Sequence, residues 1–188
     1  YILYIGRLEK KKNIIVLLRA FEAYRLEHHG TAELVLVGQP GYGWDEAHAF
    51  LQQSPVINHV HVLGWESDEH VRILQAHAAA TVCISRYEGF GIPPLESLSA
   101  GVPVLASRAG SLPEVLGDAA LYTDLDVPGT VAADLNRIIT DTSLREALRE
   151  RGLTRVPSFT WDRTAEITAR ALQAAVLQKG DKYGTVTP

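Results

Sequence analysis

Two glutamates, Glu88 and Glu96, are separated by seven residues in the segment SRYEGFGIPPLESLSAGVPVLAS, which runs from Ser85 to Ser107. Glycines and prolines lie between the two acids, and a plain core-packing pattern does not require that arrangement. A carboxylate repels a phosphate, but it can accept hydrogen bonds from a pair of neighbouring hydroxyls such as those of a sugar diol or a ribose. Two acids that bracket an anion-binding loop therefore indicate hydroxyls on both sides of a phosphate, which is the layout of a nucleotide sugar.

The segment between the two acids predicts such a loop. TVCIS (Thr81–Ser85) predicts a strand, and PPLESLSAG predicts a helix that opens with proline and ends at Gly101. The loop RYEGFGI then runs into a helix N-terminus, whose free N–H groups and partial positive charge attract anions. Gly89 and Gly91 would let the backbone approach a ligand closely. A glycine-containing loop of this kind is also common in doubly wound proteins, and Glu96 near a helix start is equally explained by the helix dipole.

A second group of candidates lies in IGRLEKKKN, residues 5–13. Arg7 directly follows the first predicted strand, and Lys12 precedes a helix that we expect Asn13 to cap. Arginine can bind a phosphate with two parallel hydrogen bonds, whereas lysine supplies a compact charge. Three consecutive lysines usually form a solvated loop, and we assign Lys10 and Lys11 to that role.

The elements that must position these residues follow an alternating pattern. Strands buried on both faces are predicted where short runs of Val, Ile and Leu occur, at residues 2–6, 33–38, 59–64, 81–85, 103–107 and 120–123. Helices are predicted between them, for example at residues 13–28 and 67–78, and three consecutive helices follow Thr123. The expected fold is α/β, a Rossmann-like, doubly wound parallel sheet of about six strands with C-terminal helices. Ligands of such sheets lie at the carboxyl ends of the strands, near a reversal in strand order.

Composition excludes several classes of function. The 188 residues are 46 % hydrophobic and 21 % charged, with a net charge of −4, so a broad electrostatic grip on nucleic acid is not expected. One cysteine, Cys83, cannot form an internal disulfide, which favours an intracellular protein and a buried, structural thiol. No apolar run approaches the roughly 20 residues of a membrane span, and no signal peptide is visible. The chain has no methionine and opens on YILYIG, so we expect a fragment cut at a domain boundary.

Three segments together resemble one family. GRLEKKKN, EGFGIPPLESLSAGVPVLAS and GSLPEVLGDAALY are similar to the C-terminal half of a GT-B glycosyltransferase of family 4, the large retaining family. The resemblance covers Tyr1 to about Ala171 and includes FTWDRTAE. The family's two glutamates, separated by seven residues, match Glu88 and Glu96, and its Arg and Lys, which hold the donor diphosphate, match Arg7 and Lys12.

The resemblance implies a role for each matched position. Glu88 contacts the donor sugar and Glu96 the ribose, while Arg7 and Lys12 hold the diphosphate, so that Arg7, Lys12 and Glu88 are the catalytic candidates. The substrate-binding candidates add the end of the first strand, the loop backbone and the segment LGWES, which lies against the base; they are Gly6, Gly64, Trp65, Gly89, Phe90, Gly91 and Ile92. Trp65 is equally explained as a packed surface aromatic.

The resemblance also implies what surrounds this chain. We expect residues 1–178 to be a nucleotide-sugar-binding domain and residues 179–188 a flexible tail, with an N-terminal acceptor domain absent. The helix near Trp161–Gln178 would cross back to that domain, and the fragment alone would be inactive. We expect a cytoplasmic enzyme whose membrane contact, if any, is made by the missing domain. No cofactor and no metal are expected, because Asp124 and Asp126 follow the last strand and the histidines lack zinc spacing.

Several alternatives remain for the function. The form EGFGIPPLES followed by GSLPEVLGDAAL favours a mannosyltransferase that uses GDP-mannose, with a glycan or lipid-linked saccharide as acceptor. UDP-sugar transferases of the same family share most of this pattern. A GT-B epimerase of UDP-N-acetylglucosamine is a second alternative, which the Glu88/Glu96 pair disfavours. A non-catalytic nucleotide-binding module is a third.

Overall fold

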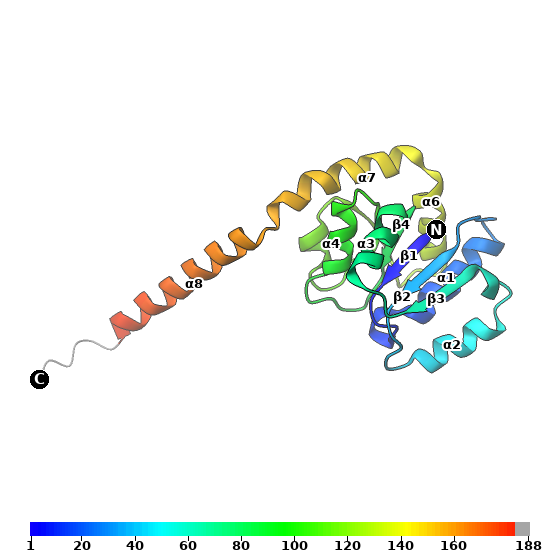
Figure 1. Ribbon diagram of the computed structural model, residues 1–188, viewed down its shortest axis with the longest axis horizontal. Helices are drawn as coiled ribbons and strands as arrows, with labels where there is room; N and C mark the ends of the chain where they lie inside the picture. Colours follow the sequence, from blue (N-terminus) through cyan, green and yellow to red (C-terminus); the bar gives the residue numbers. More distant parts are fainter. Residues whose placement is uncertain (183–188) are drawn as a thin grey trace, which may run out of the picture.

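The computed structural model describes residues 1–182 and contains one parallel sheet of six strands, in the order β3-β2-β1-β4-β5-β6 (Figure 1). The strands are β1 (Ile2–Ile5), β2 (Leu34–Val37), β3 (Val60–Gly64), β4 (Ala80–Cys83), β5 (Val104–Ser107) and β6 (Ala120–Thr123). All six lie within or at the edge of the runs that the sequence predicts. The Rossmann-like doubly wound fold is therefore confirmed.

Helices connect and flank the strands. They are α1 (Ile14–Leu26), α2 (Trp44–Gln53), α3 (Asp68–His77), α4 (Ile92–Ser99), α5 (Leu112–Leu116), α6 (Thr130–Thr140), α7 (Thr142–Arg155) and α8 (Trp161–Lys182), with 3-10 turns at Lys10–Lys12, Ile57–His59 and Val156–Ser158. Three of them, α6 to α8, follow the last strand consecutively, as the sequence predicts. Helices α2 and α5 were not predicted.

Alternation along each strand divides the core into two layers. In β1, Ile2 and Tyr4 pack in a cluster with residues of α1, α2 and α6, whereas Leu3 packs on the other face with residues of α3. Farther along the sheet, that second face is covered by α4 and α5. Successive side chains of a strand point to opposite faces, so apolar runs with no polar alternation give a sheet covered on both sides.

The chain reverses its direction of travel across the sheet at β1. From β1 it adds β2 and then β3 on one side, and it returns through α3 to place β4 on the other side of β1. The carboxyl ends of β1 and β4 therefore flank the switch point, where doubly wound sheets bind their ligands. The residues that follow these two strands include all of the matched Arg, Lys and Glu positions.

Strand β3 corrects the prediction that every strand is buried on both faces. It forms the edge of the sheet, and its residues are half-buried or exposed, with Val62 and Leu63 more than two-fifths exposed. An edge strand is paired on one side only, and here its faces are incompletely covered. His59 and His61 alternate with Val60 and Val62 in this run, a period-two pattern that is typical of a strand with an exposed face and that the prediction did not use.

The helix α8 extends away from the rest of the molecule (Figure 1). Its side chains from Trp161 to Val176 are exposed, and four of them are large and apolar: Trp161, Ile167, Leu172 and Val176. The helix includes residues 179–182, which we predicted to belong to a tail, and the remainder of that predicted tail lies outside the described residues. Of the helices described, none combines the length and the apolarity needed to cross a bilayer.

Candidate functional site

An ion pair between Lys12 and Glu88 lies at the switch point of the sheet. Lys12 ends the turn after β1, Glu88 lies in the loop after β4, and the Lys12 Nζ to Glu88 Oε1 distance is 2.6 Å. Both side chains are largely buried, with 18 % and 15 % of their surface exposed. Two residues that are 76 positions apart in the chain thus meet where a ligand of this fold is expected.

Further donors hold the same carboxylate oxygen of Glu88. The hydroxyl of Ser85 donates to Oε1 at 2.7 Å, and the thiol of Cys83 lies 3.7 Å from it. No other described residue bonds to Oε2 of Glu88. One oxygen is therefore used for orientation, and the other remains available to a ligand.

The backbone of Glu88 is held by the loop after β5. Its carbonyl oxygen accepts hydrogen bonds from the backbone N–H and from the hydroxyl of Ser111, both at 3.1 Å. The adjacent Gly110 has a positive φ of 55°, and a Cβ at this position would lie 2.3 Å from the same carbonyl. Glycine is therefore required for the close approach of the two loops. No role of Ser85, Gly110 or Ser111 was predicted from the sequence, in which the motif GSLPEVLGDAALY is the signal that contains the last two.

The Cys83 thiol is a structural neighbour of this carboxylate. It is 7 % exposed, and burial, with a further contribution from the negative charge of Glu88, raises its pKa to about 12. A neutral thiol is a poor nucleophile. The buried, structural role expected for Cys83 agrees with this position.

The loop from Gly89 to Ile92 presents free backbone amides at the start of α4. The N–H groups of Gly89, Phe90, Gly91 and Ile92 make no hydrogen bond to any other residue that the structure describes. Pro93 and Pro94 follow in the first turn of α4 and have no backbone N–H. The N–H groups available at this helix start are therefore those of the residues before Pro93. Gly91 has a φ of 92° and is packed so closely that a Cβ would lie 2.8 Å from Leu112. The arrangement is a helix N-terminus open to an anion.

A cavity of about 400 Å³ lies across the ends of β1, β2 and β3. Gly6, Arg7 and Trp65, all predicted site residues, line it together with Gly38, Gln39 and Glu66. Trp65 is 70 % exposed, so its ring can offer a face to a planar ligand. Gly64 is the last residue of β3 and does not itself line this cavity.

Two predicted residues lie apart from these contacts. Glu96 is on the exposed side of α4 and its carboxylate has no hydrogen-bond partner among the described residues. The Phe90 ring points to the segment before α8, where it packs edge-to-face on Phe159 with 6.0 Å between ring centroids. The carboxylate of Glu96 is therefore unpaired among the described residues. The backbone N–H of Phe90 still belongs to the open loop, although its ring points away.

Asn13 corrects a prediction about the start of α1. It occupies the N-cap position, but its φ is 57° and its side chain makes no capping bond. Instead its amide donates to the carbonyl of Ile84 at 2.8 Å and accepts from Nε of Arg86 at 2.9 Å. This buried side chain joins the chain after β1 to the chain after β4, because a long-range contact outweighs the local cap. It thereby fixes the spacing between Lys12 and Glu88.

Within residues 1–182 no group of three His, Cys, Asp or Glu side chains has an arrangement suited to a metal ion. The histidines His59, just before the edge strand β3, and His61, within it, both contact Glu33, at 2.9 and 3.0 Å. The hydrogen bond from His59, with a further contribution from His61, lowers the pKa of the Glu33 carboxyl. This cluster involves none of the predicted site residues.

Residues 1–155 match the model of the family described as "Glycosyl transferases group 1". The chain is 37 % identical over 171 residues to the O-antigen chain mannosyltransferase B of Escherichia coli, covering 91 % of this chain and 45 % of that protein. It is 33 % identical over 170 residues to the MMP alpha-(1->4)-mannosyltransferase of Mycolicibacterium hassiacum, covering 88 % of this chain and 40 % of that protein. The chain thus spans less than half the length of these two relatives.

Solved structures share the fold. Sucrose-phosphate synthase from Thermosynechococcus elongatus superposes with a TM-score of 0.81 at 23 % identity, over 94 % of this chain and 45 % of that one. The C-terminal domain of a group 1 glycosyl transferase from Francisella tularensis superposes with a TM-score of 0.72 at 22 % identity, over 84 % and 85 %. The Anabaena protein HepE, solved with UDP and glucose, has a TM-score of 0.79 at 22 % identity, over 92 % and 47 %. With the family model matched over most of its length, this chain belongs to the group 1 glycosyltransferases and has the fold of one half of a GT-B enzyme.

Proposed function

We propose that this chain binds the nucleoside diphosphate sugar donor of a retaining glycosyltransferase, which moves the sugar to a hydroxyl of a glycan or lipid-linked saccharide. The observation that carries the proposal is the Lys12–Glu88 pair at the switch point, beside the open amides of Gly89–Ile92. A cation, an oriented carboxylate and a helix N-terminus lie together there. That combination suits a ligand with both phosphates and hydroxyls.

The diphosphate would be stabilised as it leaves. Negative charge grows on it when the bond to the sugar breaks, and Arg7, the two remaining N–H groups of Lys12 and the amides at the start of α4 can donate to it. A preorganised donor of this kind contributes roughly 3 kcal/mol to transition-state stabilisation. No metal is needed in this proposal.

Glu88 would bind the sugar through its free oxygen. Because Lys12 and Ser85 hold Oε1, Oε2 is oriented to accept a hydrogen bond from a sugar hydroxyl. Glu96, exposed on the same helix that begins at Ile92, would bind the ribose hydroxyls. The base would lie in the cavity of Arg7 and Trp65.

We infer that the donor is GDP-mannose. The motif EGFGIPPLES and the mannosyltransferases among the relatives support mannose. A UDP-sugar is the second candidate, because HepE was solved with UDP and glucose and a trehalose-6-phosphate protein of E. coli with UDP-2-fluoro glucose. Sugar transfer would require an N-terminal domain of the parent protein to complete the acceptor site, so this chain by itself should not transfer sugar.

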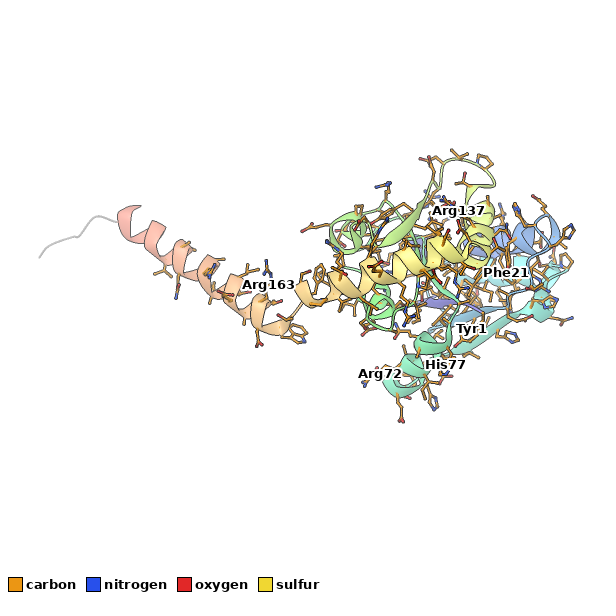
Figure 2. The ribbon with its side chains drawn as sticks, turned by 90° about the horizontal axis from the view of Figure 1, so that it is seen from above. Tyr1, Phe21, Arg72, His77, Arg137 and Arg163 are labelled. Atoms are coloured by element: carbon orange, nitrogen blue, oxygen red, sulfur yellow. The ribbon has the colours of Figure 1, made fainter. Side chains whose placement is uncertain are left out.

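Calorimetric titration of the chain tests the donor assignment. GDP, UDP, ADP and GDP-mannose are compared on the unaltered chain and on Arg7→Ala and Glu96→Ala. We expect GDP to bind best, and each variant to weaken it by about tenfold or more, since a hydrogen bond to a charged group contributes roughly 1.5–3 kcal/mol. Arg163→Ala is the matched control, because Arg163 lies on the outlying α8 (Figure 2) and is exposed.

The outcomes separate the candidates. Tighter binding of UDP than of GDP would support the proposed site and would identify the donor as a UDP-sugar instead of GDP-mannose. Binding that is equal in Arg7→Ala, Glu96→Ala and Arg163→Ala contradicts the proposed site. Binding of no nucleotide contradicts the proposal for this chain.

A further inference from the structure

A second cavity, of about 470 Å³, lies at the same edge of the sheet as the proposed donor site. Its lining comes from the ends of β5 and β6 with the residues after them, from the start of α1 and from the loop after β4, and includes Arg86, Arg108, Thr123 and Asp124. In the strand order, the cavity of Arg7 and Trp65 lies across β3, β2 and β1, and this one lies across β5 and β6. The Lys12–Glu88 pair, between β1 and β4, separates the two.

One loop joins the second cavity to Glu88. Ser107, Arg108 and Ala109 line the cavity, while Ser111, two residues farther on, holds the backbone carbonyl of Glu88. On the other side, Arg86 lines the cavity two residues before Glu88. A molecule in this cavity would therefore be a direct neighbour of the proposed sugar position.

The charges of the lining select a class of ligand. Arg86 and Arg108 bring two positive charges, and Asp124 and Asp126 bring two negative ones. A phosphate would meet the carboxylates and a cation would meet the guanidiniums, so neither ion is favoured. A neutral molecule with many hydroxyls can donate to the carboxylates and accept from the guanidiniums at the same time.

A buried hydroxyl and a preorganised cation strengthen this selection. Thr123 is 4 % exposed and lines the cavity, yet its hydroxyl has no hydrogen-bond partner among the described residues. A buried polar group without a partner is uncommon in folded proteins. The Arg108 guanidinium lies 4.3 Å from the ring centroid of Tyr122, which holds it in place. The volume lies within the roughly 300–1,000 Å³ typical of small-molecule sites.

We propose that the second cavity binds a neutral saccharide, and that this saccharide is part of the acceptor. Its identification as acceptor rests on the proposed function; its binding to the cavity does not. The free hydroxyl of Thr123 and the carboxylate of Asp124 bind sugar hydroxyls, and Arg108 donates to a third. The acceptor hydroxyl then lies next to the sugar held by Glu88, on the side away from the nucleotide.

Titration of the isotope-labelled chain with an α-linked mannobiose, followed by amide NMR, tests this inference. The titration is run with GDP absent and present. We expect shift changes at Arg108, Thr123 and Asp124. Thr123→Val, which keeps the shape and removes the hydroxyl, and Asp124→Asn should each weaken mannobiose binding by about threefold to tenfold. Thr140→Val is the matched control, because that hydroxyl is exposed on α6 and bonds to its own helix.

The controls keep this test separate from that of the donor site. Thr123→Val and Asp124→Asn should bind GDP as the unaltered chain does, which also shows that they are folded. Saccharide binding without any nucleotide binding would support the cavity and contradict the proposed function. No mannobiose shifts, shifts at another surface, equal binding by Thr123→Val, or inorganic phosphate shifting the same amides more strongly than mannobiose would each overturn the inference.

Discussion

The two carboxylate oxygens of Glu88 have different surroundings. Oε1 accepts from Lys12 and Ser85 and lies near Cys83, whereas Oε2 bonds to no other described residue. A side chain held by one oxygen loses less conformational freedom when a ligand binds the other. At this scale, the orientation of Glu88 depends partly on Ser85, for which no contact with a ligand is proposed.

Ser85→Ala tests that dependence. We expect GDP-mannose to bind about threefold to tenfold more weakly, because Glu88 loses a buried donor, while GDP, which lacks the sugar, binds as before. The ratio of the two dissociation constants, measured by calorimetry, is the readout, since unspecific damage would weaken both ligands. Ser158→Ala, an exposed serine that bonds only to the Arg155 carbonyl, serves as control. An unchanged ratio would show that Ser85 does not position Glu88.

The Lys12–Glu88 pair should also be visible in stability. Lys12→Met leaves a largely buried carboxylate without its main partner, and we expect a loss of about 1–3 kcal/mol in the free energy of unfolding. Adding Glu88→Gln should recover part of that loss, because the unpaired charge is removed. Urea unfolding of the two single variants and the double variant gives the coupling energy. Additive losses would mean that the pair contributes nothing as a pair.

The Cys83 thiol should resist modification in the folded chain. Its pKa is raised from 9.0 to about 12, chiefly by burial, so the folded protein holds almost no thiolate at pH 8 while the unfolded protein holds a measurable fraction. A chromogenic disulfide reagent should therefore react much faster in urea than in buffer. Comparable rates in the two conditions would place the thiol in contact with solvent.

The same shift predicts a pH dependence with a definite sign. From about pH 9 upward the Cys83 thiol loses its proton in the unfolded chain, whereas in the folded chain it stays protonated until about pH 12. The free energy of unfolding therefore falls as the pH rises from about 9 to about 12. Cys83→Ala should lack that part of the fall. Parallel curves for the two proteins in alkaline urea titrations would contradict the raised pKa.

At the scale of elements, two loops and one helix start form the centre of the site. The loop after β4 carries Glu88 and the open amides, and the loop after β5 holds it from behind through Gly110 and Ser111. The Phe90 ring ties the same loop to Phe159, in the segment that leads to α8. The start of α4 thus receives support from two other parts of the chain.

Gly110→Ala should disturb this arrangement more than a glycine replacement elsewhere. A Cβ at Gly110 would meet the Glu88 carbonyl at 2.3 Å, whereas Gly129, which also has a positive φ, has open space around it. Gly129→Ala should cost only the backbone strain, about 1 kcal/mol. Gly110→Ala should cost more in urea unfolding and should also weaken GDP-mannose binding. Equal effects of the two replacements would show that the two loops are not held as closely as the structure indicates.

At the scale of the molecule, one edge of the sheet carries two cavities with an ion pair between them. The chain has a net charge of −4, so any diphosphate must be held by local donors rather than by the field of the whole protein. Helix α8, with its exposed apolar side chains, extends from the opposite end of the chain (Figure 1).

Nucleotide binding should not depend on a divalent cation. Arg7, Lys12 and the amides at α4 supply the donors that a metal would otherwise supply, so we expect equal dissociation constants for GDP in EDTA and in magnesium chloride. Calorimetry in the two buffers at matched ionic strength is the measurement, because added salt alone screens charges. Binding that appears only with magnesium would contradict the metal-independent proposal.

Local patterns in the sequence determined the class of fold. The buried runs of Val, Ile and Leu predicted all six strands, and Ser67 and the acids after it predicted α3, whose first turn the Ser67 hydroxyl caps. The matched motifs indicated the family and most of the candidate site. Helices α2 and α5 escaped prediction because one is largely polar at its surface and the other has only five residues with a proline among them.

Only the tertiary structure decided which of these residues meet. Strand order is not encoded in any single strand, so the edge position of β3 and the meeting of Lys12 with Glu88, 76 positions away, follow from the folded topology alone. Asn13 shows the same effect, since a long-range contact replaced the cap that its position predicted. The second cavity joins residues from α1, β5 and β6 with Arg86, which follows β4. Such contacts depend on packing between distant segments, which the spacing of residues within one segment does not reveal.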